Sequence, residues 1–327
     1  MKLNRSLAFV GLSCLGLGAF AQSTVTISGN IQVAGTRGNG GTTPIDGLSA
    51  HKWALNDQSS VIDFSGKEDL GGGLYAGFQL RSFVGVDTGS ASAPFWASRS
   101  VVKLGGTWGE FYAGRSFTPA AFMVLFADPW YWDGSAAQVG WQIQQANYTS
   151  TGYLRTDNTV GYTSPTVGGF SANLAGAAGE QAKGKNLGGA VNYKKGALWL
   201  GLGYDQGKGF DGTGPTDHLA VAAGAWDFGV LRPMFTVAKS KVNGVSYTAY
   251  SVAATAPAGK QGLVKAAYSH LSDWNMATPE KEGLKKFSLG YQHLLSKRTN
   301  LFANISSAKG DTATATTTTE LGVGHSF

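Results

Sequence analysis

The sequence predicts an all-β protein, a transmembrane antiparallel β-barrel of sixteen strands. First, polar and apolar residues alternate from Thr24 to Val33, and the same pattern recurs along the 327-residue chain. A period of two gives a strand one apolar and one polar face. Second, no long apolar segments accompany these strands to form a soluble core. Lipid outside and water inside would satisfy both faces at once, so we expect a barrel around a water-filled pore.

Residues 1–21 are expected to be a cleaved signal peptide. Lys2 and Arg5 give a basic start, an apolar stretch follows, and a small-x-small cleavage site ends the segment. Cys14 is the only cysteine, and a glycine stands three places before it, which disfavours a lipoprotein signal. Residues 22–327 then form one outer-membrane barrel domain without a disulfide.

Composition agrees with a barrel and argues against several other classes. The mean hydropathy of −0.08 is too low for helical spans, but every second residue of a barrel strand can be polar. The net charge of +6 is spread along the chain, without the basic clusters that nucleic-acid binding requires. We therefore expect no nucleic-acid partner.

The alternating segments give the strands in order. The sixteen expected strands are 24–34, 51–66, 73–86, 95–104, 109–116, 155–164, 169–178, 185–194, 197–206, 216–226, 229–241, 244–256, 260–270, 284–294, 299–309 and 319–327. Short turns rich in Gly, Pro and Asp join some of these strands, and longer polar segments join the others. The longer connections are 35–50, 117–154, 207–215, 271–283 and 310–318. Short turns at one rim and long loops at the other are typical of outer-membrane barrels.

The phase of the apolar residues assigns the outward face of each strand. The outward sets in the clearest strands are Leu74, Ala76, Phe78 and Leu80; Val160, Tyr162, Phe170, Ala172 and Leu174; Leu198, Leu200, Leu202 and Tyr204; and Phe287, Leu289 and Tyr291. Aromatic residues gather next to the short turns, as an interfacial belt would require. The alternative is that these rings fill a soluble core.

Basic residues test the assignment of faces. A basic residue that faces lipid at the middle of the membrane costs about 2–4 kcal/mol, so it should fall on the polar phase. Arg81, Arg99, Lys103, Arg232 and Lys265 all do so. The polar phase is therefore expected to line the lumen.

Several segments resemble the trimeric general-diffusion porins of Gram-negative bacteria. They are Ser65–Leu80, Tyr112–Pro119, Asn158–Pro165 with Gly168–Phe170, Leu289–Tyr291 and Leu321–Phe327. The resemblance implies a homotrimer in the outer membrane, surrounded by lipid and lipopolysaccharide. It also implies that a third long loop folds into the lumen as a constriction, and that the barrel-insertion machinery reads the terminal strand ending at Phe327.

The resemblance places the inward loop at 117–154 and implies acidic residues on it, here Asp128 and Asp133. A row of basic residues on the wall would face them. The wall candidates are Arg81, Arg99, Lys103 and Arg115. Arg115 is the best match, because the family has Gly-Arg before this loop. The chain departs from the pattern where many relatives are basic, at Val61, Ser65 and Gly161, so its basic wall is expected to be thinner. The alternative is that these charges are ordinary solvated groups or form salt bridges within the loop.

Opposed acidic and basic rows would create a transverse field across the opening, which favours polar solutes. The sequence therefore favours passive diffusion of small hydrophilic solutes with a weak preference for anions. One alternative is a channel selective for organic anions or sugars, with the aromatic run 130–132 as a platform. Another is a non-conducting adhesin or structural barrel. The histidines at 51, 218, 270, 293 and 325 lack metal-ligand spacing, so no cofactor, metal or catalysis is expected.

Overall fold

The computed structural model describes residues 24–41, 51–138, 154–179, 184–208, 216–242, 244–273 and 282–327. The expected signal peptide and Cys14 lie outside these residues. The described chain is almost entirely β-structure. Its strands are β1 (Thr24–Gly38), β2 (Ala54–Asp57), β3 (Val61–Gly71), β4 (Leu74–Gly85), β5 (Ser90–Ala91), β6 (Arg99–Gly106), β7 (Gly109–Phe117), β8 (Arg155–Thr163), β9 (Phe170–Ala177), β10 (Asn186–Lys195), β11 (Leu198–Lys208), β12 (Thr216–Trp226), β13 (Arg232–Val242), β14 (Val245–Ala258), β15 (Gly262–Leu271), β16 (Leu284–Leu294), β17 (Thr299–Gly310) and β18 (Thr316–Ser326). One helix, α1 (Pro119–Phe126), follows β7.

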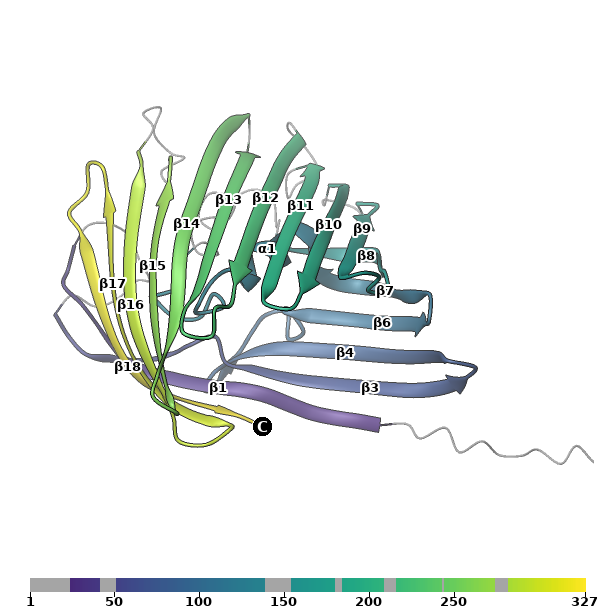
Figure 1. Cartoon of the computed structure of the whole chain (residues 1–327), viewed down its shortest axis with the longest axis horizontal. Coiled ribbons are helices and arrows are strands. Elements are labelled where there is room, and N and C mark those ends of the chain that lie inside the picture. Colours follow the sequence, from purple (N-terminus) through teal and green to yellow (C-terminus); the bar gives the residue numbers. More distant parts are fainter. Residues whose placement is uncertain are drawn as a thin grey trace, which may run out of the picture.

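The strands form a closed antiparallel barrel (Figure 1). β1 pairs with β18 on one side and with β2 and β3 on the other, which joins the two ends of the sheet. Among the described strands that form the wall, closure leaves no unpaired edge, which is a condition for a β-sheet in lipid. β2 and β3 are one strand of the wall interrupted at 58–60, and β5 is a two-residue ladder on the end of β4. The sixteen predicted strands are therefore confirmed.

Some strand boundaries differ from the prediction. β1 continues to Gly38, because its last residues pair with the early part of β18, which begins at Thr316. Residues 95–98, predicted as strand, form a turn instead. Phe95 and Trp96 pack edge-to-face within this turn, with ring centroids 4.6 Å apart. Ring packing in the loop thus replaces strand pairing at that point.

The two faces of the wall follow the predicted phase. On β11, Leu202 is 63% exposed and Leu200 40% exposed, whereas the alternating Gly201, Gly203 and Asp205 are buried. The outward residues form the lipid-facing surface. The inward residues are buried where the segment after β7 packs on them.

Aromatic residues cluster at the short-turn rim. Trp108, Phe111 and Tyr162 pack in sequence, with successive ring centroids 5.5 and 4.9 Å apart. Rings of this kind favour the interface between lipid and water. The chain ends at the same rim, where Phe327 and Gly29 exchange two backbone hydrogen bonds of 3.2 Å.

Helix α1 lies against the inward face of β10, β11 and β12. Two glycines of β11 permit this close approach: a Cβ on Gly203 would lie 2.7 Å from the Cα of Ala120, and one on Gly201 would lie 2.5 Å from the sulfur of Met123. The carboxylate of Asp205 accepts a 3.0 Å hydrogen bond from the backbone N–H of Ala120, in the first turn of α1. Among the described residues, no helix is long and apolar enough to cross a membrane.

Candidate functional site

The segment that follows α1 is organised by Asp128. This side chain is 1% exposed, and it accepts hydrogen bonds from the backbone N–H groups of Trp130, Trp132 and Gln138, at 3.0, 3.2 and 3.1 Å. Burial raises the pKa of Asp128, against the opposing effect of these donors and of Lys286. The sequence placed Asp128 in the constriction. In the structure the Asp128 carboxylate is directed at the backbone of its own turn, and its role at a constriction stays a prediction.

The same segment is fixed to a second part of the wall. Each bond joins it to an inward side chain of β16, β17 or β18: Lys286 Nζ donates to the carbonyl of Ala137 at 2.7 Å, Trp130 Nε1 donates to Asn304 at 3.0 Å, and the N–H of Ser135 donates to Glu320 at 2.7 Å. Because α1 packs on β10–β12, residues 118–138 run across the inside of the wall between two arcs of strands.

A cavity of about 350 Å³ lies between this segment and the wall. Asp133 and Trp130 line it from the segment, and Arg232 of β13 and Lys265 of β15 line it from the wall. Lys265 Nζ lies 5.9 Å from the ring centroid of Trp130. Within the described ranges, neither Arg232 nor Lys265 forms an ion pair. Two cations thus face one carboxylate across an open space.

Asp133 is the acidic residue that faces this cavity. Its carboxylate accepts a 3.1 Å hydrogen bond from the Gln32 side chain. Burial raises the pKa of Asp133 to about 7, and the neighbouring Asp128 adds to the rise. Gln32, Lys265 and Arg81 act in the opposite direction. The charge of Asp133 therefore changes near neutral pH.

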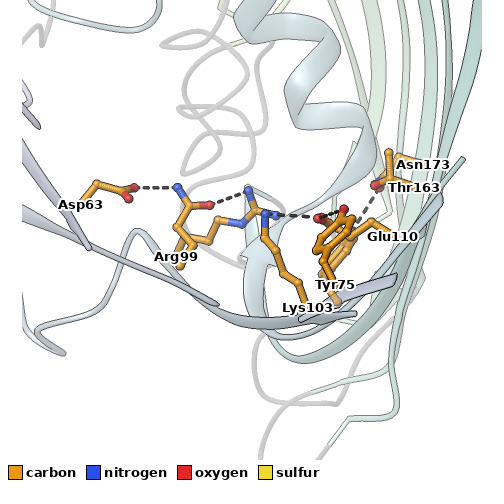
Figure 2. A network of polar contacts seen from close by, with 9 residues as sticks. Asp63, Tyr75, Arg99, Lys103, Glu110, Thr163 and Asn173 are labelled. Carbon is orange, nitrogen blue, oxygen red and sulfur yellow. Dashed lines mark hydrogen bonds and ion pairs between the residues drawn. The ribbon is translucent and has the colours of Figure 1, made fainter. Parts of the chain in front are cut away.

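Arg81 and Arg99 lie directly opposite each other on β4 and β6. Arg99 Nη1 donates to Gln79 at 3.0 Å, and Gln79 donates in turn to Asp63 at 2.6 Å. Figure 2 shows Asp63 and Arg99 at one end of this network and Glu110 and Asn173 at the other. The network holds the Arg99 guanidinium against the inner wall, 5.7 Å from the ring centroid of Tyr112.

Lys103 is paired within the wall, towards the short-turn rim. Its Nζ lies 3.4 Å from Glu110 Oε1, and the hydroxyl of Tyr75 donates to the other Glu110 oxygen at 2.9 Å (Figure 2). These three side chains line a separate cavity of about 440 Å³ with Thr24 and Lys67. Lys103 therefore lines this cavity and not the one beside Asp133, and its role at a constriction stays a prediction.

Arg115 is also paired. Its guanidinium forms an ion pair with Asp157, and its Nε donates to the carbonyl of Ala97 at 2.7 Å. Arg155, which the sequence analysis did not select, lies 3.9 Å from the ring centroid of Phe117 and donates to the carbonyl of Ser98 at 3.0 Å. The sequence contains a signal that could have identified Arg155, because this basic residue is the first residue of the strand that follows the long loop.

Arg232 and Lys265 are the other residues that the site analysis missed. Both were assigned to the inward phase, but the sequence does not say which strands face the loop. Their position depends on how residues 118–138 cross the lumen. That path is set by long-range contacts, such as that of Trp130 with Asn304, which is 174 residues away in the chain.

Comparisons with known proteins agree with this architecture. The family model for the Gram-negative porin family matches residues 8–313. The chain is 30% identical to outer membrane porin protein 32 of Delftia acidovorans over 95% of this chain and 91% of that protein. It is 27% identical to an outer membrane porin protein of Bordetella pertussis over 75% of each. The solved structure of an anion-selective porin from Comamonas acidovorans is similar at a TM-score of 0.80 and 26% identity, covering 94% of this chain and 100% of that one.

Proposed function

The chain belongs to the Gram-negative porin family, and we propose that its outer-membrane channel passes small hydrophilic anions more readily than cations. The family function is passive diffusion through a water-filled barrel. The observation that carries the preference for anions is the cavity in which Arg232 and Lys265 face Asp133. With a pKa of about 7, Asp133 is only partly ionised at neutral pH, so the basic side chains dominate the local charge. A similar solved structure is that of an anion-selective porin.

The physical basis is the potential inside a narrow aqueous opening. Low-dielectric walls focus the field of the charges that line it, and this raises the local concentration of counter-ions. Arg81 and Arg99 add two further inward cations, directly opposite each other on neighbouring strands. In this proposal Lys103 and Arg115 contribute less, because each is paired with a carboxylate.

Reversal potentials in planar bilayers test this function. Purified protein is inserted between two KCl solutions, one about tenfold more concentrated than the other, and the zero-current voltage is measured. We expect stepwise ohmic conductance and a reversal potential of the sign that chloride permeation gives. A zero or cation-type potential would contradict the proposed preference. If no conductance steps appear, the alternative of a non-conducting adhesin or structural barrel gains support.

The narrower alternative is a channel selective for organic anions or sugars. Trp130 lines the cavity beside two cations, which is the observation that favours organic anions. Titrating small carboxylates and neutral sugars into the bilayer chamber separates the two possibilities. Conductance that saturates and is blocked by one solute class favours selectivity, whereas permeation limited only by size favours general diffusion.

The remaining parts of the proposal concern the oligomeric state of the protein and its targeting to the outer membrane. We propose a homotrimer in the outer membrane, a signal peptide at 1–21 that is removed, and recognition of the strand ending at Phe327 by the insertion machinery. An outer membrane protein of Vibrio cholerae with the same fold has been solved in a trimer form. Size measurement of the unheated protein in detergent and N-terminal sequencing of the mature chain test the first two points.

A further inference from the structure

The cavity beside Asp133 is lined on one side by a row of side chains that crosses three neighbouring strands. Arg232 of β13 lies directly opposite Thr255 of β14, and Thr255 lies directly opposite Lys265 of β15. All three residues line the cavity. Because neighbouring strands are about 5 Å apart, the backbones of the two basic residues are about 10 Å apart, and both long side chains can reach one anion between them. This row is therefore suited to a carboxylate.

Polar amide side chains lie next to the basic row, nearer the short-turn rim. Gln292 of β16 lies directly opposite Phe302 of β17, and Asn300 of β17 and Gln32 of β1 both lie opposite Gly324 of β18. The three amides and the Phe302 ring line the cavity and are half-buried. A side-chain amide both donates and accepts hydrogen bonds, so this part of the cavity offers partners for the hydroxyl groups of a solute.

Gly290 allows the segment that crosses the lumen to close the cavity. This glycine of β16 lies directly opposite Lys265, and it continues the basic row. A Cβ on Gly290 would lie 3.0 Å from the ring of Trp130, so the glycine lets this ring pack against the wall. Trp130 is only 5% exposed, and its Nε1 donates to Asn304. The Trp130 ring is therefore a fixed side wall of the cavity, and it anchors the next residue, Tyr131.

Tyr131 presents an exposed aromatic ring to the same cavity. It lines the cavity and is 53% exposed. The φ angles of Tyr131 and Trp132 are 53° and 69°, so two successive residues adopt the left-handed conformation that residues other than glycine rarely adopt. The Asp128 carboxylate holds this turn through the N–H groups of Trp130 and Trp132. Backbone strain of this kind is concentrated at ligand sites, and here it displays the Tyr131 ring to a solute.

These three kinds of surface define the solute that fits best. The two cations favour a carboxylate, the aromatic rings favour a flat face of C–H groups, and the amides favour hydroxyl groups. A neutral sugar would leave the cations without a counter-ion. An aromatic carboxylate such as benzoate would leave the amides and Asp133 without hydroxyl partners. The volume of about 350 Å³ is at the small end of ligand pockets, so the cavity suits one ring rather than an oligosaccharide.

We propose that this cavity binds a monosaccharide acid, a single sugar ring that carries one carboxylate, while the solute passes through the channel. The carboxylate lies between Arg232 and Lys265, one face of the ring packs on Tyr131, and the hydroxyl groups bond to the amides and to Asp133. The proposal rests on the proposed function, because it names a solute class for that channel. It also unites the two narrower alternatives, since a sugar acid is both an organic anion and a sugar.

Block of the single-channel current tests the proposal. D-Glucuronate, D-glucose, benzoate and acetate are titrated separately into a planar bilayer chamber that contains KCl, and the half-blocking concentration of each solute is measured. The proteins are the wild type, K265Q and Y131A. K285Q is the matched control for K265Q, because Lys285 is exposed on the outer face of β16. Y131F is the control for Y131A, because it keeps the ring. Conductance steps show that each variant is folded.

We expect glucuronate to block the wild-type channel at a lower concentration than each of the other three solutes. K265Q should raise the half-blocking concentration of glucuronate about fivefold, the effect of one unit charge about 4 Å away in water. Y131A should raise it about threefold, and Y131F should restore the block.

Block by benzoate, glucose or acetate at the same concentration as glucuronate would overturn the proposal, as would equal effects of K265Q and K285Q. The zero-current voltage of the wild type in a KCl gradient is recorded in the same membranes. A chloride-type potential without block by glucuronate would overturn this inference alone, whereas a cation-type potential would contradict the proposed function.

Discussion

At the scale of single residues, Arg232 and Lys265 are expected to set the preference for anions. In water, one unit charge about 8 Å from an ion contributes about 0.5 kcal/mol, and salt at about 0.1 M reduces this to roughly half. Two charges then favour an anion by about 0.5 kcal/mol and disfavour a cation by about the same amount, which alters the anion-to-cation permeability ratio about fivefold. R232Q/K265Q should lower the anion-to-cation permeability ratio by about that factor, measured from reversal potentials. R115Q is the control for a charge removed elsewhere, because neither Arg115 nor its partner Asp157 lines this cavity. If R115Q lowers the permeability ratio equally, the charges that set the ion selectivity are not confined to Arg232 and Lys265.

Asp133 predicts how selectivity changes with pH. Its pKa of about 7 means that the carboxylate is mostly ionised at about pH 8 and mostly protonated at about pH 6. Acidification therefore removes a negative charge from the cavity, and the preference for anions should increase as the pH falls through this pKa. Reversal potentials measured from about pH 8 to about pH 5.5 check this. In D133N the step near neutral pH should disappear, whereas an unchanged step would assign the titration to another group.

The sequence could not distinguish the two acidic residues of this segment. Asp128 and Asp133 are five residues apart and both stand among aromatic residues. Only the folded turn directs three backbone N–H groups at Asp128 and leaves Asp133 towards the cavity. Arg115 presents the same difficulty, because its partner Asp157 is 42 residues away. The types of the site residues were predictable, but their partners depend on tertiary structure.

At the scale of elements, the strands were predictable because their signal is local. A period of two is visible within about five residues and needs no knowledge of the partner strand. The turn at 95–98 and the extension of β1 to Gly38 were missed for the opposite reason. Ring packing decides the first, and pairing with β18, at the far end of the chain, decides the second. The path of residues 118–138 depends on contacts of the same long range.

Glu320 is expected to hold this segment in place. Its carboxylate accepts hydrogen bonds from the N–H of Ser135 at 2.7 Å and from the side chain of Asn304 at 3.0 Å. E320A leaves these buried donors unpaired, at a cost of about 1–3 kcal/mol. We therefore expect single-channel recordings with larger or noisier conductance. T318A is the control, since Thr318 lies two residues away on the same face and its hydroxyl is not a partner of this segment.

At the scale of the whole molecule, closure of the barrel makes the two faces chemically opposite everywhere. This property was predictable, because strands with one apolar and one polar face can span a membrane only as a closed barrel with the apolar face towards lipid. The arrangement of subunits was not, because an apolar strip that meets lipid and one that meets another subunit have the same composition. Val25, Ile27 and Leu55 of the first strands are as exposed in the single chain as Leu202 on the other side.

The opposite faces predict opposite responses to a new charge on one strand. Val252 and Thr255 both lie on β14, but Val252 faces outward and is 56% exposed, whereas Thr255 lines the inner cavity. A lysine facing lipid near the middle of the membrane costs about 2–4 kcal/mol, so V252K should lower the free energy of unfolding from lipid vesicles by that amount. T255K should leave stability nearly unchanged and increase the preference for anions. Equal destabilisation by the two substitutions would mean that lipid does not cover the outer face of β14, and the whole-molecule interpretation would then fail.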